Sequence, residues 1–376
     1  MRKSLDRAAW ELSSDRVRAW VTQGAGHLGP VAFRLGRKWI EPLAIAPWIG
    51  EKQARQLPAI LRGMGGDFFC MPFGGNAKAY RKEMHSAHGE TANNVWKLDR
   101  HVGASSAEWS LRTKVRPGRV VKKIWLIPGQ TMVYQQHEIH GMTGPMNLGH
   151  HSIVQFPEAE GSGQISTSGF SFGQVYPGEF ENPALGGYSS LKRASRFSTL
   201  ESVRLATGGK TDLSRYPARR GYTDLVMLVS KLTEPFAWTA VTFPRERYVW
   251  FSLKDPRVLR QTVLWISNGG RHYYPWNGRH VSAMGIEEVT SYFHEGLAES
   301  AAPNPINRQG IPTCLGLKPD QPTRVNYIMG AVEIPAGFDV VKTIEPSGTD
   351  ILLTSSNGKK VRTPANFEFL GGKLPG

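Results

Sequence analysis

Two adjacent histidines, His150 and His151, stand where this sequence could perform proton-transfer chemistry. They follow Asn147-Leu-Gly and precede the apolar run 152–156, whose β-favouring residues and Gly/Pro borders predict a strand. Side chains alternate between the two faces of a strand, so one of these imidazoles at most can face a given cavity. An imidazole placed there can give or take a proton near neutral pH. These residues alone leave a second interpretation open, in which both are ordinary surface or hydrogen-bonded histidines.

A pair of glutamates, Glu287 and Glu288, interrupts a second apolar run, 283–290. Alternation again allows one of the two to face inward. Burial among apolar neighbours would raise the pKa of Glu287, which suits a general base. From the residues alone, an ion pair with one of the many arginines is the preferred explanation.

Three further stretches combine aromatic and hydrogen-bonding residues. The segment 65–76 places glycines on both sides of an aromatic run, which indicates tight turns and close backbone approach. The segment 85–96 is a polar loop that ends on Trp96, and the segment 268–280 is a turn rich in aromatic and polar groups. A sugar needs polar partners at its rim and a flat ring under its C–H face, so the 85–96 loop suits a carbohydrate. Core packing explains the tryptophans at least as well.

Metal and nucleotide sites are not predicted. His137-Glu-Ile-His140 lacks the spacing of the helical zinc motif, and residues three apart in a strand face opposite ways. Gly208-Gly-Lys-Thr211 resembles the end of a phosphate-binding loop, but Arg204 stands where the upstream glycine is required. We therefore expect no metal and no cofactor.

The chain is predicted to be all-β and mainly antiparallel. Glycine (41) and proline (25) are abundant among the 376 residues, and strand-like runs follow one another without intervening helical periods. One short helix is expected after Ser198, because Ser198-Thr-Leu-Glu201 has the spacing of a capping box, with Gly208-Gly209 as its end. Closing strands are expected at 325–334, 340–344, 351–354 and 367–370.

Charge and cysteine content restrict location and partners. The formal net charge is +15, but the basic residues are scattered and no nucleic-acid-binding signature is present. We expect neither a nucleic-acid nor a membrane partner; binding to DNA is a distant alternative. The scattered positive charge would suit a small acidic or phosphorylated ligand. The charged N-terminus and two cysteines predict a cytoplasmic protein without a disulfide framework.

Four segments, taken in chain order, resemble the galactose mutarotase-like (aldose 1-epimerase-like) superfamily. Phe73-Gly-Gly-Asn76 resembles its Gly-rich segment ending in Asn-Arg, and His88-Gly89 with Trp96 resembles its His-Gly-Gly loop ending in Trp. Asn147-Leu-Gly-His-His151-Ser resembles its Asn-Leu-Thr-Asn-His-Ser segment, and Gly285-Ile-Glu287 resembles its Leu-Glu-Pro segment. The chain departs from the family pattern at Ala77, Glu90 and Glu288, where Arg, Gly and Pro are expected.

The resemblance implies a β-supersandwich with a few short helices. It covers about residues 10–289, and we expect 1–376 to form one domain on which 302–376 pack as a C-terminal strand extension.

The resemblance also implies an aldose 1-epimerase-like isomerase that interconverts sugar anomers, with His151 as catalytic acid and Glu287 as catalytic base. The sugar-binding residues expected are Asn76, Lys78, His88, Trp96, Asp224, Trp276 and Arg279. The partner is then a small-molecule sugar. A non-catalytic carbohydrate-binding module of the same fold is the alternative, because the Arg expected after Asn76 is absent.

Overall fold

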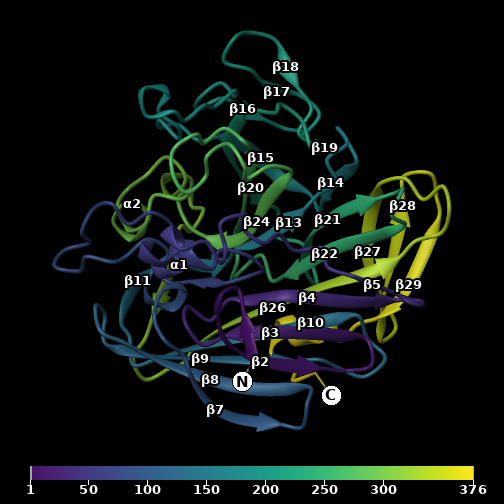
Figure 1. Cartoon of the computed structure of the whole chain (residues 1–376), viewed down its shortest axis with the longest axis horizontal. Coiled ribbons are helices and arrows are strands. Elements are labelled where there is room, and N and C mark those ends of the chain that lie inside the picture. Colours follow the sequence, from purple (N-terminus) through teal and green to yellow (C-terminus); the bar gives the residue numbers. More distant parts are fainter. Residues whose placement is uncertain (1, 376) are drawn as a thin grey trace.

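The computed structural model describes residues 2–375, which form antiparallel sheets with few helical turns (Figure 1). The all-β, mainly antiparallel fold class predicted from the sequence is confirmed. Within this range the helices are short: α1 (Ala59–Arg62), α2 (Leu297–Ala301), and the 3₁₀ turns η1 (Gln53–Gln56), η2 (Glu90–Ala92), η3 (Pro183–Leu185), η4 (Asn307–Gln309) and η5 (Phe367–Gly371). No helix in the described part of the chain is long and apolar enough to cross a membrane.

The sheet that carries the candidate site has eight strands among the described residues. Its strands, in spatial order, are β16 (Arg196–Phe197), β15 (Phe170–Val175), β20 (Tyr222–Ser230), β23 (Gln261–Asn268), β24 (Ala283–Thr290), β12 (Leu148–His150) and β6 (Phe69–Cys70), with β13 (Ser152–Gln155) also paired to β24.

A nine-stranded sheet, again counted over residues 2–375, packs against it. Its spatial order is β19 (Arg215–Tyr216), β14 (Gly163–Thr167), β21 (Ala237–Phe243), β22 (Tyr248–Lys254), β26 (Thr323–Glu333), β10 (Met132–His140), β9 (Gly118–Trp125), β8 (Ser106–Thr113) and β7 (Lys97–Val102).

Smaller sheets complete the described chain. An N-terminal five-stranded sheet holds β1 (Arg2–Ser4), β2 (Arg7–Ser13), β3 (Val17–Thr22), β4 (Leu28–Leu35) and β5 (Lys38–Ile40). Two pairs, β11 (Gly144–Met146) with β25 (Leu315–Leu317) and β17 (Val203–Arg204) with β18 (Lys210–Thr211), lie outside the large sheets, and β27 (Val341–Ser347), β28 (Asp350–Ser355) and β29 (Lys360–Pro364) form a three-stranded sheet.

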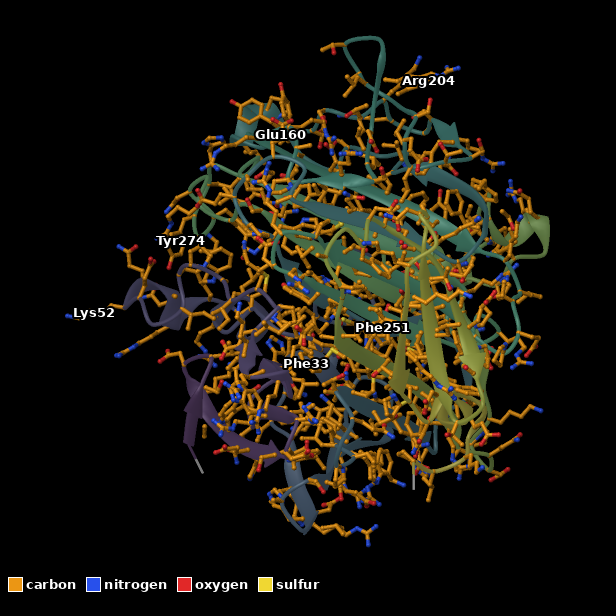
Figure 2. All side chains as sticks on the ribbon, turned by 90° about the vertical axis from the view of Figure 1, so that its right-hand side faces the viewer. Phe33, Lys52, Glu160, Arg204, Phe251 and Tyr274 are labelled. Carbon is orange, nitrogen blue, oxygen red and sulfur yellow. The ribbon has the colours of Figure 1, made fainter. Side chains whose placement is uncertain are left out.

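The nine-stranded sheet is covered on both faces, which explains its continuous apolar strands. Every residue of β21 and β22 is buried. One face shares a core with the five- and eight-stranded sheets, and this core contains Phe33; the other face packs through Phe251 against the sheet β27–β29. Figure 2 shows both phenylalanines inside the molecule and charged side chains such as Lys52 at its periphery.

The C-terminal part differs from a simple packed extension. β26 lies between β22 and β10, inside the nine-stranded sheet, so the chain as far as Glu333 belongs to the sandwich itself. The sheet β27–β29, at the right in Figure 1, is the added part.

Two local predictions are wrong. The helix expected after Ser198 is absent: the glycines 208 and 209 form the turn of the β17–β18 pair, and the buried side chain of Val203 anchors this pair. The strand expected at 367–370 is the 3₁₀ turn η5, which buries Phe369 and Leu370 against the nine-stranded sheet. A short hairpin outweighs the capping signal in the first place, and burial of apolar side chains outweighs the strand signal in the second.

Candidate active site

The strand register brings His151 and Glu287 face to face. β24 pairs with β12 through Gly149 and Val289, and with β13 through Ser152 and Ile286. The same antiparallel register places His151 opposite Glu287. Directly opposed residues point to the same face of a sheet. The imidazole Nε2 lies 3.1 Å from the Oε1 atom of Glu287.

The neighbouring members of each pair point to the other face of the sheet. Nδ1 of His150 lies 2.9 Å from Oδ2 of the buried Asp67. Glu288 accepts hydrogen bonds from Thr239 and Thr262 at 2.7 Å and forms an ion pair with the buried Lys254. The expectation that one residue of each pair faces inward therefore holds, and strand alternation is the reason.

Gly285 leaves the space that the Glu287 carboxylate occupies. It lies two residues before Glu287 on the same face of β24. A Cβ atom at this position would lie 2.7 Å from Oε1 of Glu287 and 3.1 Å from Cβ of Trp265. The glycine in the Gly-Ile-Glu segment thus has a steric role, because any side chain here would push the carboxylate aside.

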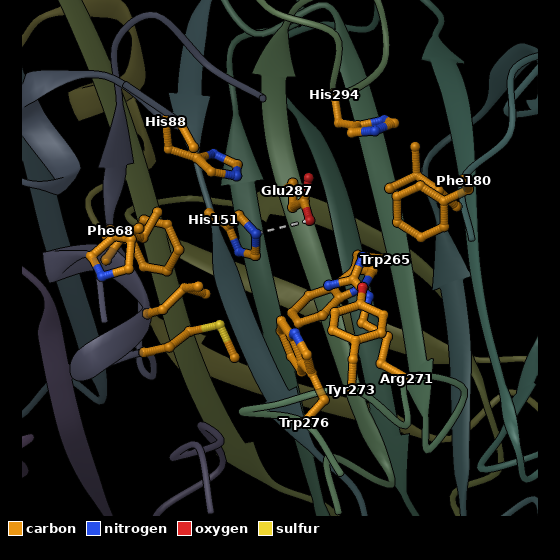
Figure 3. A pocket seen from close by; sticks show the side chains of 16 residues that line it. Phe68, His88, His151, Phe180, Trp265, Arg271, Tyr273, Trp276, Glu287 and His294 are labelled. Atoms are coloured by element: carbon orange, nitrogen blue, oxygen red, sulfur yellow. Dashed lines mark ion pairs between the residues drawn. The ribbon is translucent and has the colours of Figure 1, made fainter. Parts of the chain in front are cut away.

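A cavity of about 320 Å³ opens above this pair. Leu225 on β20 pairs with Trp265 on β23, which pairs with Gly285 on β24, and these strands form the floor. Loops supply the walls, and the lining residues are Pro58, Ile60, Leu61, Met64, Phe68, Ala87, His88, His151, Phe180, Leu225, Trp265, Arg271, Tyr273, Trp276, Glu287 and His294. Figure 3 shows His88, His151 and Glu287 on one side of the cavity and Trp265, Tyr273 and Trp276 on another.

Aromatic stacking fixes the His151 ring. Phe68 stacks on it at a centroid distance of 4.5 Å, and His27 stacks on the other face of Phe68 at 4.4 Å. The backbone N–H of His151 donates to the carbonyl of Phe68 at 2.9 Å. Nδ1 of His151 has no hydrogen-bond partner among the described residues. The ring is therefore held by packing, and its Nε2 is directed at Glu287.

Burial favours the uncharged forms of both groups. Glu287 is 2% exposed, and desolvation raises the pKa of its carboxyl group well above the ordinary value. Desolvation, helped by the nearby His88, lowers the pKa of His151 well below its ordinary value. An acid whose ionisation is disfavoured and an imidazole whose protonation is disfavoured thus lie in direct contact, with Nε2 of His151 and Oε1 of Glu287 3.1 Å apart.

His88 presents its other ring nitrogen to the cavity. The backbone N–H of Gly74 donates to Nδ1 of His88 at 3.4 Å, and the Cys70 thiol lies 3.2 Å from the same nitrogen. Nδ1 therefore accepts, Nε2 carries the proton, and burial lowers the pKa of the ring to about 4. The next residue must be glycine, because at the φ of +72° adopted by Gly89 a Cβ would lie 1.9 Å from the carbonyl oxygen of Met71.

An arginine borders the aromatic side of the cavity. Nε of Arg271 donates to Oε1 of Glu181 at 2.6 Å, and its guanidinium lies 4.6 Å from the centre of the Trp276 ring. The hydroxyl of Tyr273 donates to the other oxygen of Glu181 at 3.3 Å. The arginine charge is thus balanced by a buried carboxylate.

The sugar-binding residues expected from the sequence divide into two groups. His88 and Trp276 line the cavity together with His151 and Glu287. Asn76 does not: its side chain donates to the carbonyls of Pro72, Gly74 and Ser86 and accepts from the backbone N–H of Leu297. Its amide is fully used in holding two loops together.

Asp224 also points away from the cavity. It follows Tyr222 and Thr223 on β20 and directly precedes the cavity residue Leu225, so alternation turns it to the opposite face. There it accepts from the backbone N–H and the hydroxyl of Ser190 at 2.9 and 2.6 Å.

Three more expected residues lie outside the cavity lining. Lys78 is exposed and forms an ion pair with Glu299 at 3.3 Å. Arg279 pairs with Glu51 at the surface at 2.6 Å. Trp96 is fully buried in the core, where its Nε1 donates to the carbonyl of Thr91 at 2.9 Å.

Several lining residues were not singled out from the sequence. Trp265, Phe180 and His294 approach from separate segments, and no local pattern marks them. Arg271 and Tyr273 belong to the aromatic turn 268–280, and the composition of this turn is the signal that could have identified them as cavity residues. Within residues 2–375, no group of three or more His, Cys, Asp or Glu side chains is placed to hold a metal ion.

Comparison with known proteins identifies the fold. No protein-family model and no curated protein matches the sequence. A proposed aldose 1-epimerase from Escherichia coli K12 has a similar structure, with a TM-score of 0.58 and 12% identity over 87% of this chain and 99% of that chain. A galactose mutarotase-related enzyme from Lactobacillus acidophilus has a TM-score of 0.55 and 11% identity, covering 87% and 100% of the two chains. A galactose mutarotase-like protein from Lactobacillus casei has a TM-score of 0.56 and 9% identity, covering 86% and 100%.

These similarities agree with the resemblance drawn from the four sequence segments, and they show the fold. The chain has the galactose mutarotase-like fold, as a divergent example of it.

Proposed function

We propose that this protein interconverts the anomers of a reducing sugar. The observation that carries the proposal is the 3.1 Å contact between His151 Nε2 and Glu287 Oε1 on the floor of a sugar-sized cavity. Anomer exchange needs one group to remove the proton of the C1 hydroxyl while another protonates the ring oxygen. No cofactor is required, because the ring opens to the aldehyde, the C1–C2 bond rotates, and the ring closes again.

In this proposal, one proton that passes between Glu287 and His151 across their 3.1 Å contact supplies both roles. Its transfer from Glu287 to Nε2 gives a carboxylate and an imidazolium, which are the base and the acid of the reaction. Sugar hydroxyls bound beside them would stabilise this charged form, which burial by itself disfavours. Ring opening moves the C1 hydroxyl proton to Glu287 and the imidazolium proton to the ring oxygen. Ring closure on the other face of C1 reverses both transfers, and the return of one proton from His151 to Glu287 then restores the uncharged pair. Positioned acid and base groups contribute about 10²–10⁴-fold each.

The test is anomer exchange followed by NMR or polarimetry over a panel of hexoses, deoxyhexoses and phosphosugars. Wild-type protein is expected to accelerate exchange for at least one sugar, and Glu287→Gln and His151→Ala to reduce that acceleration by about 10²-fold or more. The matched controls are Glu345→Gln and His101→Ala at exposed positions. A wild-type rate in Glu287→Gln would contradict the proposal.

A carbohydrate-binding module that lacks catalysis is the second candidate. It is favoured by one observation: Ala77 stands where the family resemblance leads us to expect an Arg that would contact the sugar. Binding of a sugar, measured by calorimetry, without accelerated exchange of any sugar in the panel would establish this function in place of the first.

A further inference from the structure

The cavity offers few partners for sugar hydroxyls. The side chains of Asn76, Asp224 and Trp96 are satisfied elsewhere, as described above. Beside the His151–Glu287 pair, the polar groups of the lining are the Nε2–H of His88, the ring of His294, the outer edge of the Arg271 guanidinium, the Tyr273 hydroxyl and the indole N–H groups of Trp265 and Trp276. A hydroxyl that is buried without a partner loses its hydrogen bonds to water, and this loss weakens binding. A fully hydroxylated hexose is therefore poorly matched to this cavity.

The greater part of the lining is apolar. Trp265, Trp276 and Phe180 provide aromatic surfaces, and Leu225 lies on the floor. Pro58, Ile60, Leu61 and Met64, from α1 and the residues that flank it, form an aliphatic wall. Covering methyl and methylene groups of a ligand with surfaces of this kind is favourable, because it removes apolar area from water.

The charges that face the cavity cancel. Glu181 balances Arg271 at 2.6 Å, and burial keeps Glu287 and His151 uncharged. His88 and His294 are also held neutral, with pKa values lowered to about 4 and about 3 by burial. The cavity thus carries no net charge that would favour a phosphate or a carboxylate, despite the overall charge of +15.

We propose, on the basis of the function proposed above, that the substrate is a neutral reducing sugar in which a methyl group replaces a hydroxymethyl or hydroxyl group. The anomeric hydroxyl and ring oxygen would contact His151 and Glu287. The methyl group would pack on the aliphatic wall of Ile60, Leu61 and Met64, and the C–H face of the ring would lie on Trp265 or Trp276.

The test compares pairs of sugars that differ in this one group: D-fucose with D-galactose, and D-quinovose with D-glucose. A methyl-binding pocket discriminates against an added hydroxyl by about 10–100-fold, so kcat/KM for anomer exchange is expected to be higher by that factor for the deoxy sugar of at least one pair. Equal or faster exchange of the parent hexoses in both pairs would overturn this inference and leave the proposed function standing.

Absence of any accelerated exchange would instead refute the proposed function. Calorimetric affinities for the same pairs then decide the inference: tighter binding of a deoxy sugar supports it, and tighter or equal binding of the hexoses overturns it. Glucose 6-phosphate serves as the charged probe, and it is expected to be the weakest substrate and ligand of the set.

A substitution in the wall links the preference to these residues. Leu61→Gln introduces a polar side chain at a half-buried position and is expected to reduce the deoxy-to-hexose ratio several-fold without loss of folding. Leu232→Gln is the matched control, because Leu232 is 64% exposed and lies outside the cavity lining. If the deoxy-to-hexose ratio is unchanged in Leu61→Gln and the variant has a normal melting temperature, the aliphatic wall does not cause the preference.

Discussion

Gly285→Ala is the perturbation that tests most finely how Glu287 is placed. The added Cβ would lie 2.7 Å from Oε1 of Glu287, whereas ordinary contacts of a Cβ atom begin near 3.4 Å. The carboxylate must therefore move by about 0.7 Å. Displacements of about 1 Å from a productive geometry cost up to 10²-fold in rate, so we expect kcat for anomer exchange to fall roughly 10–100-fold.

The substitution should leave the fold intact. The other close contact of the new methyl group is Trp265, whose Cβ lies at 3.1 Å, and modest overpacking of this kind costs about 1–3 kcal/mol. The assay is NMR exchange of the best sugar of the panel, together with urea unfolding and the ¹⁵N shift of His151 Nε2. Gly316→Ala is the control, since nothing lies within 4 Å of a Cβ on that strand residue. A wild-type kcat in Gly285→Ala would refute the idea that a tightly positioned Glu287 carries the reaction.

Three further outcomes are expected. Asp224→Asn should lower the free energy of unfolding by about 1–3 kcal/mol, because it weakens the bonds from Ser190, and should not slow anomer exchange; a large rise in KM would show that Asp224 reaches the sugar. Lys254→Met should lower the free energy of unfolding by about 3–5 kcal/mol, because it leaves the buried Glu288 without its charged partner. Adding Glu288→Gln should recover part of this loss. If the effects of the two substitutions simply add in the double mutant, this coupling is contradicted. Burial lowers the pKa of His280 to about 3, so the unfolded chain binds the extra proton below pH 6.5. Stability from this group is complete above pH 6.5 and is lost, by about 1.4 kcal/mol per pH unit, as the pH falls toward 3. Because His88 and His294 titrate in the same direction, His280→Asn should reduce the fall of the urea midpoint between pH 6.5 and 4 without abolishing it. An unchanged slope would contradict the assignment.

The opposite orientation of neighbouring residues is the feature of the site that could be predicted from the sequence. Strand alternation showed that His150 and His151, like Glu287 and Glu288, must point to opposite faces, and the structure has them so. This short-range rule is reliable because the period of a strand is fixed at two residues. It does not say which member of each pair faces the cavity; the family resemblance implied His151 and Glu287.

The surrounding residues depend on register and on loops, which local sequence does not determine. Asp224 was expected in the cavity, yet its neighbour Leu225 is the residue that the register with Trp265 places there. Trp96 was expected to stack on a sugar, but it fills the core, as its alternative interpretation allowed. The helix expected after Ser198 failed for a similar reason, since the β17–β18 pairing decides that segment.

The most direct test of the account is one comparison: exchange between the anomers of D-fucose in the presence of wild-type protein and of Glu287→Gln, at equal fractions of bound sugar. If Glu287 and His151 share the proton that opens the ring, wild-type protein accelerates exchange. The variant still binds the sugar, but it turns over at least about 10²-fold more slowly. Equal exchange in both samples, well above the protein-free rate, would contradict the assignment of the reaction to this pair.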